Sequence, residues 1–353
     1  MTTLCWRVPV VLVVTALLVG GLLAQPAAQA AAPPPDLGAG RVARNVTYCT
    51  GDGQPLTMDL YFPSQAASIP MPTVVFVHGG GWEIGEKDTP DEIAPEMIRR
   101  GYVVASINYR LAPQSRWPAQ IEDVKCAIRY LRAEAGTYHL DAERIGVWGS
   151  SAGGHLAALL GLTDSRAGFD GPGGYPDQSS RVQAVVDLYG PADLPALTKT
   201  GSDRMVETMQ RVFGAGGKMP VALLQQASPV AYVSSAAPPF LILQGDKDTM
   251  VPASQSEELY RRLRAAGVPA TLVLVRNGDH GFVPAGGLVS PSQAERTRLI
   301  GDFFDRYLLA PAGTPSSTAA LGLPDLWALP VLAQTIREQI LDYASAYHGM
   351  RAQ

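Results

Sequence analysis

Short runs of Val, Ile and Leu alternate along this chain with longer stretches in which apolar residues recur every three or four positions. Such short runs are typical of strands buried on both faces, and the longer stretches are typical of amphipathic helices. The predicted strands cover residues 73–77, 102–107, 144–148, 182–188, 240–243 and 270–275, and the predicted helices cover 92–100, 119–134, 152–162, 254–266 and 291–309. The alternation predicts an α/β fold with a mostly parallel central sheet and helices on both faces.

The composition is that of an ordinary globular protein and argues against nucleic acid as a partner. Hydrophobic residues make up 46% of the chain, and 28 Lys and Arg stand against 32 Asp and Glu, for a net charge of −4. The sequence contains no dense block of Lys or Arg that could neutralise a row of phosphates.

A candidate nucleophile lies in the pentapeptide Gly149-Ser150-Ser151-Ala152-Gly153, which matches G-x-S-x-G. It falls between a predicted strand and a predicted helix. A sharp strand-to-helix turn strains the backbone of its central residue, and glycines two positions before and after leave room for that turn. Ser151 is therefore the predicted nucleophile, whereas Ser150 lacks the two flanking glycines.

A serine hydroxyl needs a base, and the sequence offers five histidines. His280 follows the last strand before the final helix and stands after both the serine and the candidate acids, as the chain order Ser, Asp, His requires. His155, one helical turn after Ser151, is the nearest alternative. Its place on the nucleophile helix favours a structural role, so His280 is the predicted base.

Two carboxylates that could orient the base follow the strand at 240–243, where ligands bind in α/β folds. Asp246 stands directly after Gly245 and could simply cap the turn. Asp248 reaches further along the loop towards His280 and is the preferred acid. Asp246 stays as the alternative.

Three successive glycines, Gly79, Gly80 and Gly81, follow the strand at 73–77 and let the chain turn its N–H groups towards Ser151. Together with the N–H of Ala152, directly after the nucleophile, they could stabilise the charge that develops on a carbonyl oxygen. Trp82, next to this loop, is predicted to line the substrate site.

Four motifs resemble the hormone-sensitive-lipase-like esterases of the α/β-hydrolase fold, and are similar to those of secreted acetyl- and feruloyl-type esterases. These are HGGGW at 78–82, NYRLAP at 108–113, DAERIGVWGSSAGGHLA at 141–157 and GDKDTMVP at 245–252. The resemblance implies an oxyanion hole formed by Gly80, Gly81 and Ala152, and Asp248 as the acid. It also implies hydrolysis of short-chain acyl esters, including acetyl or feruloyl esters of carbohydrates, without a metal or organic cofactor.

The expected activity is therefore that of a serine carboxylesterase acting through an acyl-enzyme. An amidase of the formamidase type shares the HGGGW loop and the triad and is the alternative. A non-catalytic binding module on the same fold would be expected to lack a triad residue, and Ser151, Asp248 and His280 are all present.

The N-terminus resembles a secretory signal. Arg7 precedes an apolar run at 8–23, and Ala28-Gln29-Ala30 follows it as a cleavage site. The run is shorter than the ~20 residues of a spanning helix. Residues 1–30 are thus a predicted signal peptide of a secreted or periplasmic protein with no stable membrane anchor after cleavage.

The rest of the chain divides by composition and periodicity. We predict a flexible leader at 31–45, a catalytic domain at 46–310 with a cap or lid insert at 191–237, a linker at 311–325 and an amphipathic helix at 326–353. The short leader and modest insert leave little chain to roof a deep tunnel, so acyl groups of about two to six carbons are expected.

Two cysteines remain after removal of the signal, Cys49 and Cys126. An even pair in an oxidising compartment could form a disulfide. Cys126 lies in a predicted amphipathic helix, where a cysteine also serves as a small buried apolar residue. Both possibilities stay open at the level of sequence.

Overall fold

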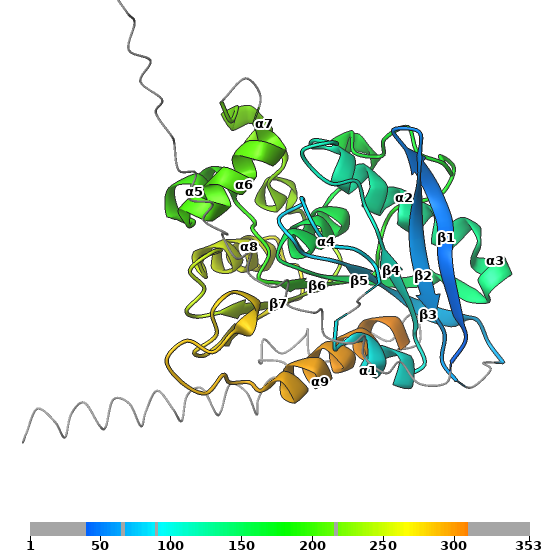
Figure 1. The fold of residues 1–353 in the computed structure, drawn as a ribbon. Coiled ribbons are helices and arrows are strands. Elements are labelled where there is room, and N and C mark those ends of the chain that lie inside the picture. The colour runs from blue at the N-terminus through cyan, green and yellow to red at the C-terminus, as the bar shows by residue number, and fades with distance from the viewer. Residues whose placement is uncertain (1–39, 65–67, 89–90, 215–217, 310–353) are drawn as a thin grey trace, which may run out of the picture. The chain divides into compact units, whose positions relative to one another are not determined.

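The computed structural model describes residues 40–64, 68–88, 91–214 and 218–309 (Figure 1). Within these residues the chain forms an eight-stranded sheet with the order β1-β2-β4-β3-β5-β6-β7-β8. Its strands are β1 (Val42–Gly51), β2 (Gln54–Tyr61), β3 (Met71–Val77), β4 (Val103–Ile107), β5 (Leu140–Ser150), β6 (Ala184–Leu188), β7 (Phe240–Gly245) and β8 (Ala270–Val275). From β4 to β8 all neighbours are parallel, so the predicted α/β fold with a mostly parallel sheet is confirmed.

The first two strands were not predicted. They form an antiparallel hairpin at one edge of the sheet, and β2 pairs antiparallel with β4. An antiparallel edge has one wetter face, so its strands mix polar and apolar residues and lack the unbroken apolar runs of the centre. A local signal was present in Asp52-Gly53, which joins the strands with positive φ angles of 49° and 75°, because this dipeptide favours a tight hairpin turn.

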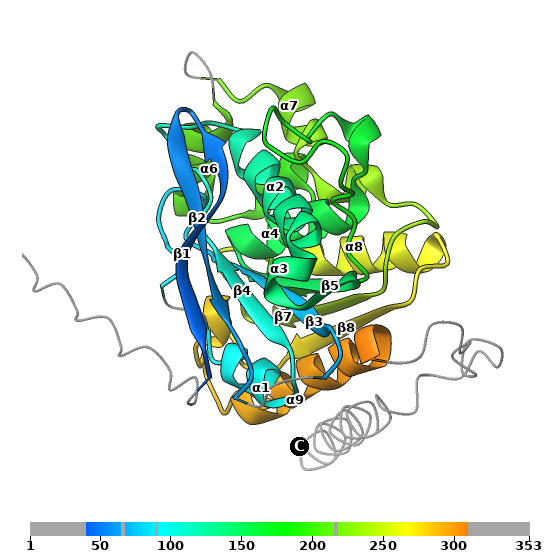
Figure 2. The same ribbon diagram turned by 90° about the vertical axis from the view of Figure 1, so that its right-hand side faces the viewer.

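Helices cover both faces of the sheet (Figures 1 and 2). On one face lie α1 (Ala94–Arg99), α9 (Gln293–Phe304) and the final turn η4 (Asp305–Leu309). On the other lie α2 (Ala119–Ala133), the short α3 (Ala135–Tyr138), α4 (Ala152–Leu162) and α8 (Ser254–Ala265). The five helices predicted from periodicity correspond to α1, α2, α4, α8 and α9 with η4.

The sheet has an apolar core on each side because successive side chains of a strand point to opposite faces. On β3, Val74 and Phe76 pack with residues of α1 and α9, whereas Val75 and Val77 pack with residues of α2, α4 and α8. These two cores pack against opposite faces of β3 and its neighbours. The carboxyl ends of these strands carry the loops of the candidate site.

Between β6 and β7 the chain leaves the sheet and forms α5 (Leu194–Thr200), α6 (Asp203–Phe213), α7 (Val221–Gln226) and the turn η2 (Pro229–Tyr232). These helices lie on the same side as α4 and α8 (Figure 1). They occupy the range predicted as an insert, 191–237. Two further short turns are η1 (Ser165–Ala167) and η3 (His280–Phe282).

The predicted signal peptide, linker and C-terminal helix, and residues 31–39 of the leader, lie outside the described residues. In the part of the chain that the structure covers, no helix has both the length and the apolar character needed to cross a membrane.

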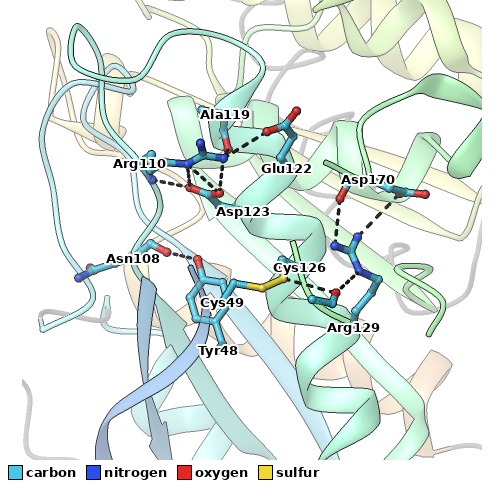
Figure 3. Close-up of a disulfide and its surroundings, with 11 residues drawn as sticks. Tyr48, Cys49, Asn108, Arg110, Ala119, Glu122, Asp123, Cys126, Arg129 and Asp170 are labelled. Atoms are coloured by element: carbon cyan, nitrogen blue, oxygen red, sulfur yellow. Dashed lines mark hydrogen bonds and ion pairs between the residues drawn. A yellow bond between two sulfur atoms is a disulfide. The ribbon is translucent and has the colours of Figure 1, made fainter. Parts of the chain in front are cut away.

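A disulfide joins the edge strand to a helix of the core (Figure 3). Cys49 on β1 and Cys126 on α2 are bonded, with 6.5 Å between their Cα atoms. Of the two possibilities left open by the sequence, the structure therefore has the disulfide. Next to it, the Tyr48 hydroxyl donates a hydrogen bond of 2.5 Å to the carbonyl of Asn108.

Candidate active site

Ser151 lies at the turn between β5 and α4, where the backbone is strained. Its φ is 54° and its ψ is −117°, which is an unfavourable region for a residue with a side chain. The turn is tight enough that a Cβ on Gly149 would overlap the backbone of Gly153, and one on Gly153 would overlap the carbonyl of Val77. The two glycines of the G-x-S-x-G motif are therefore required by backbone contacts on both sides of the serine.

His280 follows β8 in the turn η3 and stands between the serine and an acid. Its Nε2 atom lies 2.9 Å from Ser151 Oγ, and its Nδ1 atom lies 2.8 Å from Asp248 Oδ2. Because an ionised carboxylate only accepts hydrogen bonds, Nδ1 carries the proton and Nε2 is free to accept from the serine hydroxyl. This is the arrangement in which an imidazole can act as a general base.

Asp248 is the acid that the structure brings to His280. Its side chain is fully buried, and Oδ1 accepts hydrogen bonds from the N–H groups of Met250 at 2.9 Å and Val251 at 2.8 Å. The amide of Gln244 donates to Oδ2 at 3.1 Å. Asp246, the alternative acid, is exposed to solvent and its N–H donates to Val275 instead.

A second carboxylate, missed at the level of sequence, ties the loops of the acid and the base together. Asp279 Oδ1 accepts from the N–H of Thr249 and from the N–H of His280, both at 2.8 Å. The hydrogen bond from Thr249, followed by that from His280, lowers the pKa of Asp279. The signal in the sequence was an Asp directly before the candidate base, a residue that commonly accepts from backbone N–H groups in turns.

Tyr189 was also missed. It follows β6 with a positive φ of 46°, and its ring meets that of His280 edge-on with 4.9 Å between centroids. Burial raises the pKa of the Tyr189 hydroxyl well above its ordinary value. The hydroxyl therefore stays protonated. The contact between the two rings restricts the orientation of His280.

The glycine loop after β3 adopts conformations that favour glycine. Gly80 has a φ of 107° and Gly81 a φ of 62°, which residues with side chains rarely adopt. Gly79 approaches the nucleophile turn so closely that a Cβ on it would lie 2.9 Å from the carbonyl oxygen of Ser150. The loop thus borders Ser151, and Ala152 opens α4, where the first N–H groups of a helix have no partner within it.

The NYRLAP segment holds this loop in place. The Tyr109 hydroxyl donates to the carbonyl of His78 at 3.0 Å, and the N–H of Ala112 donates to the carbonyl of Trp82 at 2.8 Å. Arg110 in turn donates to both oxygens of Asp123 on α2 (Figure 3). The motif is therefore a support that connects the glycine loop to the core.

A cavity of about 520 Å³ opens onto the serine and the histidine. One face of α6 forms a wall of it, with Arg204, Met205, Thr208 and Arg211. Its other lining residues come mainly from the glycine loop and from the turns after the strands: Gly79, Gly80, Gly81, Glu83, Ile84, Ser150, Ser151, Tyr189, Met250, His280 and Gly281.

Two arginines of this wall differ in their surroundings. Arg211 forms a bidentate ion pair with Glu83, with 2.5 Å from Nε to Oε1 and 2.9 Å from Nη2 to Oε2. This pair joins α6 to the end of the glycine loop. Arg204 is exposed at the cavity and has no ion-pair partner among the residues that the structure describes. Arg204 therefore adds a positive charge to the cavity wall.

Trp82 does not line the cavity, and the prediction that it does is wrong. Its side chain is completely buried. The indole Nε1 donates to His155 Nδ1 at 3.2 Å, and the ring packs edge-on against Phe213 at 5.4 Å. The backbone of Trp82 has a positive φ of 61°. The rival base His155 is itself buried and makes its hydrogen bonds outside the triad, in agreement with its structural interpretation.

The fold and these contacts together define an α/β-hydrolase of the serine hydrolase class. Among the known families, the chain belongs to BD-FAE, whose family model matches residues 58–263, more than half of the 353 residues. It is thereby an α/β-hydrolase of the hormone-sensitive-lipase-like esterase group, as the motifs suggested.

Two curated relatives are esterases of Mycobacterium tuberculosis. Esterase LipC is 34% identical over 244 residues, which cover 68% of this chain and 59% of LipC. Esterase LipQ is 33% identical over 269 residues, which cover 74% of this chain and 62% of LipQ. The chain thus spans about three fifths of the length of these relatives.

A similar solved structure is described as a truncated form of a carbohydrate esterase from gut microbiota. It has a TM-score of 0.67 and 28% identity, and the match covers 78% of this chain and 99% of that one. The match extends over nearly the whole of that esterase.

Proposed function

We propose that this protein is a serine carboxylic ester hydrolase that works through an acyl-enzyme on Ser151. The observation that carries the proposal is the unbroken series of contacts from Ser151 Oγ to His280 at 2.9 Å and from His280 to Asp248 at 2.8 Å. This series opens into the cavity beside the glycine loop. The esterase relatives support an ester over the amide substrate of a formamidase-type enzyme.

In the first half of the reaction, Ser151 Oγ attacks the carbonyl carbon of the ester while His280 Nε2 takes the hydroxyl proton. The carbonyl oxygen becomes an oxyanion, which the N–H groups of Gly80, Gly81 and Ala152 stabilise. The C–O bond to the alcohol then breaks, and His280 returns its proton to the departing alkoxide. Asp248 stays ionised throughout and stabilises the imidazolium.

In the second half, water replaces the alcohol. His280 Nε2 takes a proton from the water as its oxygen attacks the acyl carbon, and the same N–H groups stabilise the second oxyanion. The ester bond to Ser151 breaks and the proton returns to Oγ. The products are one carboxylic acid and one alcohol, and the enzyme is regenerated.

The proposed substrates are esters of short acyl groups, including acetyl or feruloyl esters of carbohydrates. The similarity to a carbohydrate esterase supports the sugar alcohol. The apolar side chains Ile84, Met205 and Met250 in the cavity support a small apolar acyl group. A cavity of about 520 Å³ lies in the lower half of the range for small-molecule sites.

The direct test replaces the nucleophile. Ser151→Ala is expected to fold normally and to lose nearly all hydrolysis of nitrophenyl acetate, because no acyl-enzyme can form. Ser150→Ala, one residue away, is the matched control and should keep most of the rate. A Ser151→Ala protein that retains more than a few per cent of the wild-type kcat would refute the assignment, and a nitroanilide assayed in parallel separates esterase from amidase activity.

A series of nitrophenyl esters tests the acyl group. Each methylene bound in an apolar pocket contributes about 0.8 kcal/mol, so a deep tunnel would raise kcat/KM steeply with chain length. We expect a maximum at about two to six carbons and a fall beyond it. A maximum at eight carbons or more would contradict the short-chain proposal. Deletion of residues 311–353 would then show whether the C-terminal segment contributes to the acyl site.

Secretion or periplasmic location, with cleavage near Ala30, belongs to the same proposal. The signal-like sequence at 1–30 supports it, and so does the Cys49–Cys126 disulfide, because disulfides persist in oxidising compartments. Expression of the full chain followed by N-terminal sequencing of the exported protein is the test. A protein that stays inside the cell with its first 30 residues intact would contradict it.

A further inference from the structure

His155 uses both nitrogens of its ring inside the core, although the proposed reaction does not involve it. It lies on α4, four residues after Ser151, and is completely buried. Its Nδ1 lies 3.2 Å from Trp82 Nε1, and its Nε2 lies 2.7 Å from the carbonyl oxygen of Ala227. An indole N–H only donates and a carbonyl only accepts, so the ring is neutral with its proton on Nε2.

These two hydrogen bonds connect three elements that border the catalytic serine. Trp82 directly follows Gly80 and Gly81, the predicted oxyanion donors. His155 lies on the nucleophile helix, and Ala227 directly follows α7 in the segment between β6 and β7. One imidazole therefore links the oxyanion loop, the nucleophile helix and the insert.

The packing around the ring extends this link to the cavity wall. Trp82 meets His155 edge-on at 5.2 Å and Phe213 edge-on at 5.4 Å. Phe213 is the last residue of α6, whose Thr208 lines the cavity. Thr208 also lies close to the glycine loop, since a Cβ on Gly81 would lie 3.0 Å from the Thr208 methyl group.

We propose that His155 is a positioning residue for ester hydrolysis. Its bond from Trp82 sets the oxyanion loop at the distance from Ser151 that the reaction needs, and its bond to Ala227 holds the α6–α7 segment over the cavity. The inference rests on the proposed esterase function. Burial lowers the pKa of His155 to about 4, so both bonds persist at neutral pH.

Two amide substitutions separate the bonds. In His155→Asn the side-chain oxygen can take the place of Nδ1 and still accept from Trp82, but no donor reaches Ala227. In His155→Gln the amide N–H can take the place of Nε2 and still donate to Ala227, but Trp82 loses its acceptor. We expect His155→Gln to lower kcat at least tenfold with little change in KM, because a displaced oxyanion donor weakens transition-state binding. We expect His155→Asn to raise KM severalfold with kcat largely kept.

Two further readouts distinguish positioning from a purely structural role. Active sites are titrated with a phosphonate that labels the serine, so that kcat refers to folded enzyme only. Affinity for a trifluoromethyl ketone, whose oxyanion occupies the hole, should fall in His155→Gln by the same factor as kcat/KM. His139→Asn is the matched control, because His139 is an exposed histidine outside the site.

Trp82→Phe removes the indole donor while His155 is kept, and it tests the same link if His155→Gln does not fold. It should reproduce the loss of kcat. The double variant with both His155→Gln and Trp82→Phe should lose little more, because the two changes break the same hydrogen bond. Equal kinetic behaviour of the two His155 variants, or wild-type kcat per titrated site in both His155→Gln and Trp82→Phe, would overturn the proposal. A wild-type protein that hydrolyses no ester would instead refute the proposed function.

Discussion

The two oxygens of the Asp248 carboxylate have different partners, and this division explains how one side chain can orient the base. Oδ1 accepts from two backbone N–H groups of its own loop. Oδ2 faces His280 Nδ1 and also accepts from Gln244. Because the backbone holds Oδ1, Oδ2 cannot rotate away from the imidazole. A short polar turn thus supplies the orientation that the base requires.

Asp248→Asn should therefore lower kcat severely. An amide in this place can present its N–H groups to Nδ1 and favour the tautomer in which Nε2 carries the proton and cannot accept from Ser151. The expected loss in kcat is about 10³–10⁴-fold. Asp246→Asn, two residues away in an exposed position, should keep kcat within about twofold. Steady-state assays of both variants decide the matter, and a larger loss at Asp246 would transfer the role to that residue.

Asp187 is a buried carboxyl group on β6, close to Gly154 at the start of α4. Oδ1 accepts from the N–H of Gly190 at 2.9 Å, and Oδ2 has no partner among the described residues. Burial raises the pKa of Asp187 to about 7. The folded state therefore holds this proton more tightly than the unfolded state does. Its contribution to stability is complete at low pH and is lost as the pH rises from about 4 to about 7.

The free energy of unfolding should reflect this titration. Asp187→Asn cannot ionise, so it removes the share of the pH dependence that Asp187 supplies. Relative to the wild type, the variant should gain about 2–3 kcal/mol between pH 5 and pH 8, at about 1.4 kcal/mol per pH unit below the folded pKa. Urea unfolding at both pH values measures the gain. A stability difference that is the same at pH 5 and pH 8 would contradict it.

At the scale of elements, the site depends on the contact between the end of β5 and the start of α4. The strand and the helix meet so closely that the residue at 149 can have no side chain, because a Cβ there would overlap the backbone of Gly153. The backbone of Gly153 is confined in turn by the carbonyl of Val77 on β3. The position of the nucleophile is therefore set by three packed backbone segments.

Gly149→Ala is expected to displace this turn. Neither backbone can yield without moving a strand of the central sheet, so kcat/KM should fall at least tenfold and the protein should be destabilised by about 1–3 kcal/mol. Gly136→Ala is the matched control: it lies within α3 with open space around its Cα, and Ala there should be neutral or slightly stabilising. Equal effects of the two substitutions on kcat/KM would argue against a tight turn.

For the molecule as a whole, the disulfide connects parts of the chain that are far apart in sequence. Cys49 and Cys126 are separated by 77 residues, a span that contains the glycine loop and its NYRLAP support. Closure of so long a loop restricts the unfolded chain. The bond also fastens the edge hairpin to a helix of the core. Among the described residues, this hairpin joins the rest of the sheet through β4 alone.

Replacement of both cysteines by serine should thus lower the free energy of unfolding by about 2–4 kcal/mol. The triad contacts lie elsewhere in the molecule, so kcat at 25 °C should stay near that of the wild type. Urea unfolding of the variant and of reduced wild-type protein should give similar values. Unchanged stability after reduction would show that the bond adds nothing to the folded state.

Local patterns in the amino-acid sequence determine much of the fold and the turn that carries the nucleophile. The strand at 270–275 and the helix at 152–162 match β8 and α4 in their bounds, because buried parallel strands and helices have distinct apolar periods. The glycines around Ser151 marked the strained turn, since backbone crowding acts between neighbours in sequence. The hairpin of β1 and β2 was missed, because an edge strand lacks the unbroken apolar run of a central one.

Only the tertiary structure decided which distant side chains meet. It selected Asp248 over Asp246, placed Tyr189 against His280, and turned Trp82 into the core towards His155. It also joined Cys49 to Cys126. Each of these outcomes depends on distances between segments that are far apart in the sequence, and no local pattern determines such distances. Periodicity and backbone sterics act along the chain, whereas the choice of partners follows from how the sheet brings its carboxyl ends together.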